Sequence, residues 1–324
     1  MSSAHLTLTD IPGIMVGHVT DKENGTGCTA ILCPDGAAAG MELRGMAPGS
    51  RETNLFDPLT RTEEIHGILL TGGSAYGLAA ASGVVRWLAE NGYGLVTTKG
   101  RVPLVPAAVI YDLFFNQTFN LPDEHMGYQA AQAASSEPVE QGSVGAGTGA
   151  TAGKIAGIDR AMKTGLGSAG IKSGDFKVAA LAVANPVGDV VDPDNSRILA
   201  GVRSPDGKTI MGAMNVLNQA ADLFASSDPN TVLGVVATNA RLTKIQAARV
   251  ARMASAAFAR AIRPASTLSD GDMVFSLATG QGPDGDETLI GALGAEVLAQ
   301  AIAAAARTAT GYRGLPTFSD FADK

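Results

Sequence analysis

The segment that decides how the rest of the chain is interpreted is Asp228-Pro-Asn-Thr-Val-Leu-Gly-Val-Val-Ala-Thr-Asn-Ala240. Residues 232–237 form a short apolar run, rich in β-branched side chains and bounded by turn residues, which predicts a strand buried on both faces. Pro229 has no N–H to donate to a sheet and fixes its own φ, so the chain reaches this strand from a loop. Thr231 is therefore predicted to be the first residue of a central strand.

This position suits a nucleophile that the chain makes by cutting itself. If the hydroxyl of Thr231 attacks the carbonyl carbon of Asn230, an N-to-O acyl shift and hydrolysis of the ester leave a threonine with a free α-amine. That amine titrates near ~7.7, so one residue would carry both nucleophile and base at neutral pH. Asn and Thr are also ordinary turn and strand-start residues, so the local sequence leaves a purely structural interpretation open.

Composition limits the kinds of partner that the chain can have. The 324 residues are 45% hydrophobic and 17% charged, enough to bury a large core, and the net charge of −7 comes without any run of Lys or Arg. This balance argues against a nucleic acid or a membrane as partner and favours a small molecule. Residues 1–5 lack a basic region followed by an apolar stretch, and no segment offers ~18 uninterrupted apolar residues. We therefore expect a cytoplasmic protein.

Metal-binding and disulfide patterns are weak in this sequence. Cys28 and Cys33 are too few for a disulfide framework and lack the companions that a zinc site needs. The histidines, at positions 5, 18, 66 and 125, show no ligand spacing. We expect no metal and no other cofactor, and we interpret both cysteines as small buried residues.

A glycine-rich turn follows a strand predicted at 66–71. The turn, Gly72-Gly-Ser-Ala-Tyr-Gly77, leads into a helix predicted over about 78–90, an order that is similar to the nucleophile elbow Gly-x-Ser-x-Gly. Tyr76 stands where the second glycine should be, so we do not expect Ser74 to be a nucleophile. We expect the turn to let backbone approach backbone and to present free N–H groups at the start of the helix toward a pocket.

A second glycine-rich stretch, residues 142–154, ends at Lys154. For a phosphate-binding P-loop the first glycine falls on Thr148, and Ile155 stands where Ser or Thr is needed. For a dinucleotide fingerprint the third glycine falls on Ala152. We therefore expect no nucleotide site here. A lysine in such a loop is nevertheless placed close to backbone and substrate.

Polar residues stand at the ends of other predicted strands. The strand at 105–112 includes Tyr111, a position typical of a half-buried packing residue. Asn185 comes before a proline, where its amide either starts a turn or points into a site as an oxyanion donor. Asp270 and Asp272 lie on a turn before a strand, where acids are usually solvated or cap the turn. Apolar residues at helical spacing predict a helix at 243–262. A helix predicted at 287–307 is almost uncharged in its second half and must therefore be buried, in the core or between subunits.

In this order, these pieces resemble peptidase family S58, the self-processing hydrolases of the DmpA type, which include the β-peptidyl aminopeptidases and the nylon-oligomer hydrolases. Each stretch is weak alone, but six in a fixed order are specific. The matching stretches are 72–77, 109–112, 145–154, 184–188, 230–237 and 270–275.

The resemblance implies an α/β fold, a four-layer αββα sandwich resembling the N-terminal nucleophile hydrolases, in one domain over residues 1–324. It implies cleavage between Asn230 and Thr231 into an α chain, 1–230, and a β chain, 231–324. It also implies a homotetramer of cleaved protomers, and a small-molecule or oligomeric amide as substrate.

The same resemblance implies roles for the residues around the cleavage point. Thr231 would be the nucleophile and its α-amine the base. Lys154 would lie beside the nucleophile and help to keep the amine neutral by like-charge repulsion. Asp270 and Asp272 would hold the amine and the hydroxyl of Thr231.

The resemblance also implies roles for Asn185 and Tyr111, and this chain departs from the aminopeptidases of the family at two positions. By resemblance, Asn185 would donate to the oxyanion and Tyr111 would hydrogen-bond at the scissile amide. The aminopeptidases of the family use serine where this chain has Thr231. They also carry a glutamate two residues before the tyrosine to hold a free amine, and here that position is Val109.

Without that carboxylate there is little reason to demand a free N-terminus, and Asn-Thr is the junction of the nylon-oligomer hydrolases. We therefore expect an amidase for linear amides such as 6-aminohexanoate oligomers, with an aminopeptidase of the D-amino-acid or β-peptide type as the nearest alternative. The polar segment 41–62, which we interpret as an irregular surface excursion, differs from the nylon hydrolases. An acyl transferase like ornithine acetyltransferase, whose Ala-Thr-Met motif is missing here, and a non-enzymatic scaffold remain alternatives.

Overall fold

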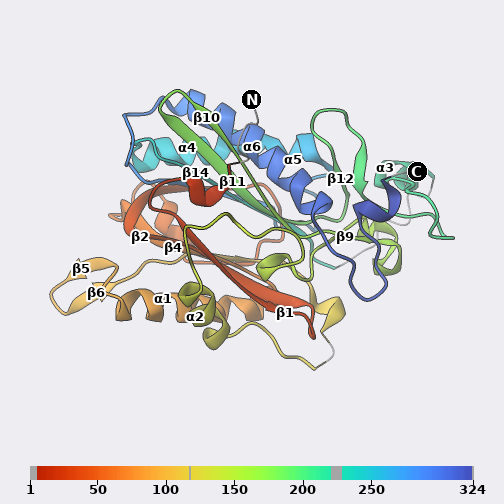
Figure 1. Ribbon diagram of the computed structural model, residues 1–324, viewed down its shortest axis with the longest axis horizontal. Coiled ribbons are helices and arrows are strands. Elements are labelled where there is room, and N and C mark those ends of the chain that lie inside the picture. The colour runs from red at the N-terminus through yellow and green to blue at the C-terminus, as the bar shows by residue number, and fades with distance from the viewer. Residues whose placement is uncertain (1–5, 117, 220–227, 323–324) are drawn as a thin grey trace.

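The computed structural model describes residues 6–116, 118–219 and 228–322 and arranges them in four layers (Figure 1). Helices cover the two outer sides of a pair of facing layers of strands. The main sheet has nine strands, eight in the order β10-β11-β14-β16-β2-β4-β7-β3 and β1, which pairs with β2 beside this path. The expected αββα sandwich is confirmed.

One long strand, β2 (Thr26–Leu43), belongs to both layers of strands. Its register against β4 shifts between Leu32 and Ala37, and such an irregularity bends a strand. Before the bend β2 pairs with β1 and β4. After it β2 pairs with β16 and, at Ala37 and Ala38, again with β4. The first layer contains β10 (Leu166–Ser173), β11 (Phe176–Asn185), β14 (Thr231–Thr238) and β16 (Met273–Ala278). The second contains β1 (Met15–Asp21), β4 (Glu64–Thr71), β7 (Ala107–Val109) and β3 (Ser50–Arg51).

The residues of β14 alternate between two cores. Leu233 and Val235 point between the two layers of strands, where they pack in one cluster with Ile68 of β4. Val232 and Val236 point the other way and join the cluster beneath the outer helices. Period-two alternation explains this division, and every residue of β14 is buried, as predicted from the apolar run.

Helices complete the outer layers. On the side of the first layer lie α4 (Lys244–Ala254), α5 (Ala256–Ala261) and α6 (Glu287–Arg307), and on the side of the second lie α1 (Ala81–Glu90) and α2 (Glu124–Gln132). By length and composition alone α6 could cross a membrane, but most of it is buried inside the fold. The prediction that its nearly uncharged second half is buried is confirmed.

Three predicted elements differ in length from those observed. The helix expected over 243–262 is interrupted at Ser255, whose hydroxyl donates a hydrogen bond to the carbonyl of Arg252 at 2.7 Å. The strand expected over 105–112 is only three residues long, so Tyr111 lies in the turn after it. Segment 41–62 is less irregular than expected, because β2 extends to Leu43 and β3 pairs with β7.

The remaining strands and the remaining α-helix are short. They are β5 (Leu95–Thr97) with β6 (Gly100–Val102), β8 (Thr151–Ala152) with β9 (Met162–Lys163), the set β12 (Asp189–Val191), β13 (Ile198–Ala200) and β15 (Ile262–Arg263), and α3 (Ala213–Gln219). Cys28 and Cys33 are free and buried, as expected, and burial raises the pKa of Cys28 to about 12.

Candidate active site

The bond between Asn230 and Thr231 lies at the edge of the space between the two layers of strands. Thr231 is the first residue of β14, as predicted, and its side chain is only 4% exposed. Its partner in the neighbouring strand β11 is Asn185. Since paired residues of antiparallel strands project to the same side, the Thr231 hydroxyl and the Asn185 amide occupy one face.

The peptide of Asn230 is held by the turn that precedes β16. The backbone N–H of Asn230 donates to the carbonyl of Ser269 at 2.8 Å, and the N–H of Gly271 donates to the carbonyl of Asn230 at 2.7 Å. The hydroxyl of Thr231 donates to the same carbonyl oxygen at 2.5 Å. The candidate nucleophile is therefore fixed beside the carbonyl that it would attack, and that carbonyl already receives two donors.

Asn185 is fully buried, and both the oxygen and the nitrogen of its side-chain amide form hydrogen bonds. Its Oδ1 atom accepts from the N–H of Thr151 at 3.1 Å and from the ammonium of Lys154 at 2.8 Å. Its Nδ2 atom donates to the carbonyl of Tyr111 at 3.0 Å. An amide nitrogen carries two hydrogens, so one N–H remains for an oxyanion beside Thr231.

Lys154 is buried in this network. Its Nζ atom donates to the carbonyl of Thr151 at 2.8 Å, to the hydroxyl of Thr151 at 3.1 Å and to the carbonyl of Asn185 at 3.1 Å. Burial lowers the pKa of Lys154 well below its usual value, and the charge of Asp270 works against this lowering. None of the hydrogen bonds among the described residues joins Lys154 to Thr231, so any effect of Lys154 on Thr231 is electrostatic or passes through Asn185.

The backbone carbonyl of Tyr111 binds a residue of the site, whereas its ring packs against a neighbouring aromatic side chain. Its carbonyl holds Asn185, whereas its half-buried ring packs edge-on against Phe114, with 5.1 Å between the ring centroids. Burial, followed by the charge of Asp228, raises the pKa of the Tyr111 hydroxyl. This hydroxyl therefore stays protonated at neutral pH and is available as a donor to a substrate.

Asp270 and Asp272 are both buried, so of the two expected alternatives solvation is wrong, whereas both carboxylates do accept from N–H groups of the turn, as caps do. Asp272 accepts from the N–H of Val232 at 2.8 Å and from the N–H of Ser266 at 3.0 Å. Burial and the neighbouring Asp270 raise the pKa of Asp272 to about 7. The Oδ2 atom of Asp270 accepts from Thr267, and its Oδ1 atom is buried without a hydrogen-bond partner among the described residues.

The structure therefore brings all the predicted site residues to one place, although not in every predicted contact. Asp272 holds the residue after Thr231 rather than Thr231 itself, and Asp270 keeps one oxygen free. Sequence reasoning missed Thr151, Gly271 and Ser266, whose contributions are mostly backbone groups. For Gly271, the only signal in the sequence was its position between the two acids. A Cβ there would lie 2.9 Å from the Thr231 hydroxyl and 2.7 Å from the carbonyl of Ala47.

The turn around Ser74 has its backbone N–H groups hydrogen-bonded within the fold. The N–H of Gly72 donates to the carbonyl of Gly27, that of Gly73 to the carboxylate of Asp112, and that of Ser74 to the carbonyl of Ile110. These three N–H groups are therefore not free to face a pocket, whereas the expectation of free N–H groups concerned the start of the helix that follows. The turn instead fastens the segment around Asp112, one residue after Tyr111.

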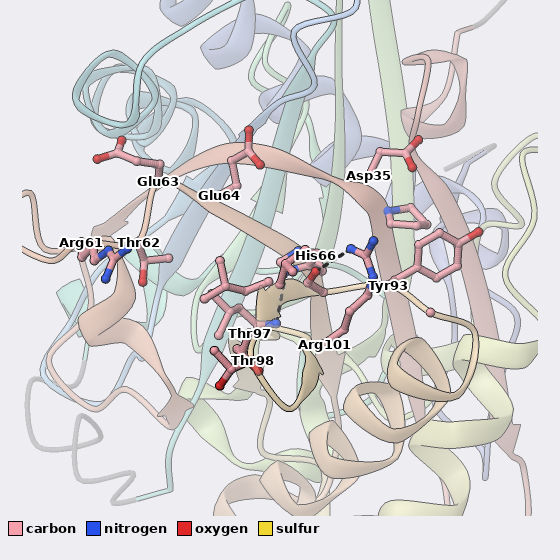
Figure 2. Close-up of a pocket in the computed structure, with 16 residues that line it drawn as sticks. Asp35, Arg61, Thr62, Glu63, Glu64, His66, Tyr93, Thr97, Thr98 and Arg101 are labelled. Carbon is pink, nitrogen blue, oxygen red and sulfur yellow. Dashed lines mark hydrogen bonds between the residues drawn. The ribbon is translucent and has the colours of Figure 1, made fainter.

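A cavity of about 990 Å³, whose lining residues are drawn in Figure 2, includes none of the candidate-site residues in its lining. His66, near the start of β4, and Leu104, just before β7, contribute to its lining, whereas Tyr111 follows the end of β7. The Nδ1 atom of His66 accepts from the N–H of Leu104 at 3.3 Å, and burial and Arg101 lower the pKa of this histidine. Within the described residues, no group of three or more His, Cys, Asp or Glu side chains could hold a metal ion.

Comparison with known proteins supports a hydrolytic site. The chain matches peptidase family S58 over residues 7–315. A protein of Mycobacterium leprae named an uncharacterized aminopeptidase is 39% identical over 98% of this chain and 94% of its own length. The 6-aminohexanoate-oligomer endohydrolase of Paenarthrobacter ureafaciens is 33% identical over 83% of this chain and 74% of its own length.

Solved structures with low sequence identity share the fold. The L-aminopeptidase D-Ala-esterase/amidase of Ochrobactrum anthropi, described as a variant of the Ntn hydrolase fold, superposes with a TM-score of 0.72 at 20% identity, over 98% of this chain and 91% of its own. A β-aminopeptidase of Burkholderia superposes with a TM-score of 0.69 at 21% identity, over 100% of this chain and 94% of its own. The sequence relatives favour an enzyme over a scaffold. The chain is an amide-bond hydrolase that belongs to peptidase family S58.

Proposed function

We propose that this hydrolase cuts its own chain between Asn230 and Thr231 and then uses Thr231 to hydrolyse linear amides such as 6-aminohexanoate oligomers. One observation carries the proposal. The hydroxyl of Thr231 lies 2.5 Å from the carbonyl oxygen of Asn230, and the N–H of Gly271 donates to that oxygen at 2.7 Å.

Self-cleavage would proceed through an ester. The Oγ1 atom of Thr231 attacks the carbonyl carbon of Asn230, the peptide C–N bond breaks, and the hydroxyl proton ends on the released α-nitrogen. Negative charge develops on the carbonyl oxygen during the attack, where the N–H of Gly271 is already in place to stabilise it. Water then hydrolyses the ester, which frees the hydroxyl of Thr231 and leaves Asn230 as a carboxylate.

Turnover of a substrate would use the new α-amine as the base. The amine takes the hydroxyl proton as Oγ1 of Thr231 attacks the substrate carbonyl, and it returns a proton to the leaving amine. The second N–H of Asn185 would donate to the oxyanion, because the first is committed to Tyr111. Lys154 would keep Asn185 in the required orientation through its bond to Oδ1.

Apolar surface near the cleavage point supports an aliphatic substrate. Met46 is 64% exposed and Leu268 is 76% exposed. Both lie in segments that contact Asp270, since Ala47 donates its N–H to the carbonyl of Asp270 and Thr267 binds its carboxylate. Methylene groups of a linear amide could cover these side chains.

An aminopeptidase is the second candidate, and two observations favour it. The relative that is 39% identical is named an aminopeptidase. Asp228 is close enough for its charge to raise the pKa of Tyr111, so a carboxylate is present near the site even though Val109 is apolar. Val109 itself is 5% exposed and packs closely against Gly49. A Cβ added to that glycine would lie only 2.5 Å from the Cγ2 atom of Val109.

The first experiment is intact-mass analysis of the denatured protein, followed by N-terminal sequencing. We expect two chains, the smaller beginning Thr-Val-Leu-Gly-Val. An intact chain after prolonged incubation would refute self-cleavage. We also propose that cleaved protomers form a homotetramer and reside in the cytoplasm, and light scattering tests the former.

The second experiment separates the two substrate classes. The same 6-aminohexanoate oligomer is offered with its amine free and with its amine acetylated, and kcat/KM is compared. An endo-acting amidase should accept both. If acetylation abolishes cleavage, the substrate's ammonium is being held by a carboxylate, and the aminopeptidase becomes the better assignment.

A further inference from the structure

Lys163 is among the largest fully buried side chains of the described residues, and the proposed chemistry does not use it. Lysine is almost never fully buried unless its charge is compensated. Its Nζ atom donates to the backbone carbonyls of Gly147 at 3.2 Å, Ala150 at 2.9 Å and Thr164 at 2.5 Å. An ammonium has three hydrogens, so these three carbonyls match its full donor capacity.

Two of these carbonyls belong to the glycine-rich loop that leads to the candidate site. The loop continues into Thr151, which pairs with Lys163 between β8 and β9. The N–H of Thr151 donates to the side chain of Asn185, and the carbonyl of Thr151 accepts from the ammonium of Lys154. The position of this loop therefore determines where Asn185 and Lys154 are held.

Asp112 also lies against this loop. A Cβ on Gly149 would be 2.5 Å from the Cβ of Asp112, so the loop and the aspartate are in close contact. The carboxylate of Asp112 accepts from the N–H of Gly73 at 2.7 Å, and Asp112 directly follows Tyr111. The loop is therefore in contact with both a buried carboxylate and a buried ammonium.

A further bond connects Lys163 to the region around Asn185. The hydroxyl of Thr164 donates to the carbonyl of Ala184 at 2.5 Å, and the N–H of Thr164 donates to the carbonyl of Ala150 at 3.1 Å. The carbonyl of Thr164 is also one of the three acceptors of Lys163. Lys163 is thus bonded directly to the loop and connected through Thr164 to the strand that ends at Asn185.

We infer that Lys163 and Asp112 form a positioning pair, which holds the loop 147–151 so that Asn185, Lys154 and Tyr111 meet at Thr231. The inference rests on the proposed function, because it assigns the pair a role in that reaction. Neither side chain touches the reacting atoms. Burial lowers the pKa of Lys163 to about 7 and raises that of Asp112 to about 6, and each charge opposes the shift of the other.

Lys244 provides a matched control. It is also buried, and its Nζ atom donates to the carbonyl of Asp57 at 2.7 Å, to the hydroxyl of Thr60 at 2.7 Å and to the carbonyl of Thr60 at 3.4 Å. These acceptors lie in a surface segment outside the candidate site. Replacing either lysine by methionine removes a buried ammonium together with its contacts to three oxygens.

The test compares Lys163→Met with Lys244→Met in the full-length protein, by the rate of self-cleavage, by kcat and KM for a 6-aminohexanoate oligomer, and by the Tm. Both variants should lose Tm. Only Lys163→Met should cleave itself slowly and lose kcat, by about 10²-fold with little change of KM, since small misplacements of catalytic groups cost about that much. Equal kcat in the two variants would overturn the inference. A wild-type protein that neither cleaves nor hydrolyses would instead overturn the proposed function.

The double variant Lys163→Met/Asp112→Asn separates positioning from stability and serves where Lys163→Met does not fold. Removing both buried charges together avoids leaving one without its counter-charge, so the Tm should recover relative to either single variant. The kcat should stay low, because methionine cannot hold the three carbonyls. Recovery of kcat together with Tm would show that Lys163 acts only through stability and would overturn the inference.

Discussion

Thr231 and Ser74 both stand at a junction between a strand and a turn, yet only one is surrounded by groups suited to chemistry. At Ser74, the three consecutive N–H groups of the turn are all given to Gly27, Asp112 and Ile110. At Thr231, an N–H from Gly271 reaches the carbonyl beside the hydroxyl. Two buried carboxylates and a buried lysine lie nearby. A hydroxyl becomes a credible nucleophile through the donors around the carbonyl that it attacks, and less through the turn that carries it.

The largest effect should come from Thr231→Ala, which removes the hydroxyl from the more favourable of the two junctions. Because that hydroxyl is needed for self-cleavage and turnover, the variant should fold, stay as one chain on a denaturing gel and lose hydrolysis to background. Thr231→Ser keeps a hydroxyl and should still mature. Cleavage of the alanine variant would mean that an external protease cuts the chain, and the comparison with Ser74 would lose its basis.

A smaller effect is expected from the donor that Thr231 has and Ser74 lacks. Asn185→Ala should mature slowly and lose roughly 10²–10³ in kcat, the usual size for one oxyanion donor. Asn185→Asp is sharper, because it keeps the acceptor for Thr151 and Lys154 but has no N–H to give. A rise in KM with unchanged kcat in both variants would make Asn185 a binding contact instead.

The acids near Thr231 should leave a signature in stability. Burial first, and Asp270 second, raise the pKa of Asp272 to about 7, far above the unfolded value of about 3.9. The folded state therefore holds this proton more tightly, and the contribution of Asp272 to the free energy of unfolding falls as the pH rises from about 4 to about 7. Asp272→Asn should flatten this dependence in denaturation measured at about pH 5 and about pH 8. An unchanged slope, equal to that of the exposed Asp206→Asn, would contradict the shift.

The sequence predicts the strand at Thr231 well, since an apolar run after a proline has few other interpretations. It also predicts Asn185 and Lys154 at the site, through motifs that resemble a family. It fails for Gly271 and Thr151, because their contributions are backbone groups, and any residue type supplies an N–H or a carbonyl. It also fails for the burial of Asp270 and Asp272, because a turn that is covered by another segment has the same local composition as one in solvent.

The smallest effect should come from Ser74→Ala, and this variant tests the comparison from its other side. Ser74 has a φ of 53°, a backbone conformation that L-residues seldom adopt, so alanine should fold with the same strain. The backbone N–H bonds of the turn do not depend on the side chain, and the Tyr111–Asp112 segment should therefore keep its place. We expect self-cleavage and kcat within about twofold of the wild type, because no interaction of the reacting atoms is removed.

Ser74→Gly should be equally active and should not lose Tm, since glycine adopts this φ without strain, at an entropic cost. A loss of kcat in Ser74→Ala approaching that of Thr231→Ala would place the nucleophile at the glycine turn. The satisfied N–H groups there argue that no such loss will be found, since an attack by Ser74 would leave its oxyanion without those donors.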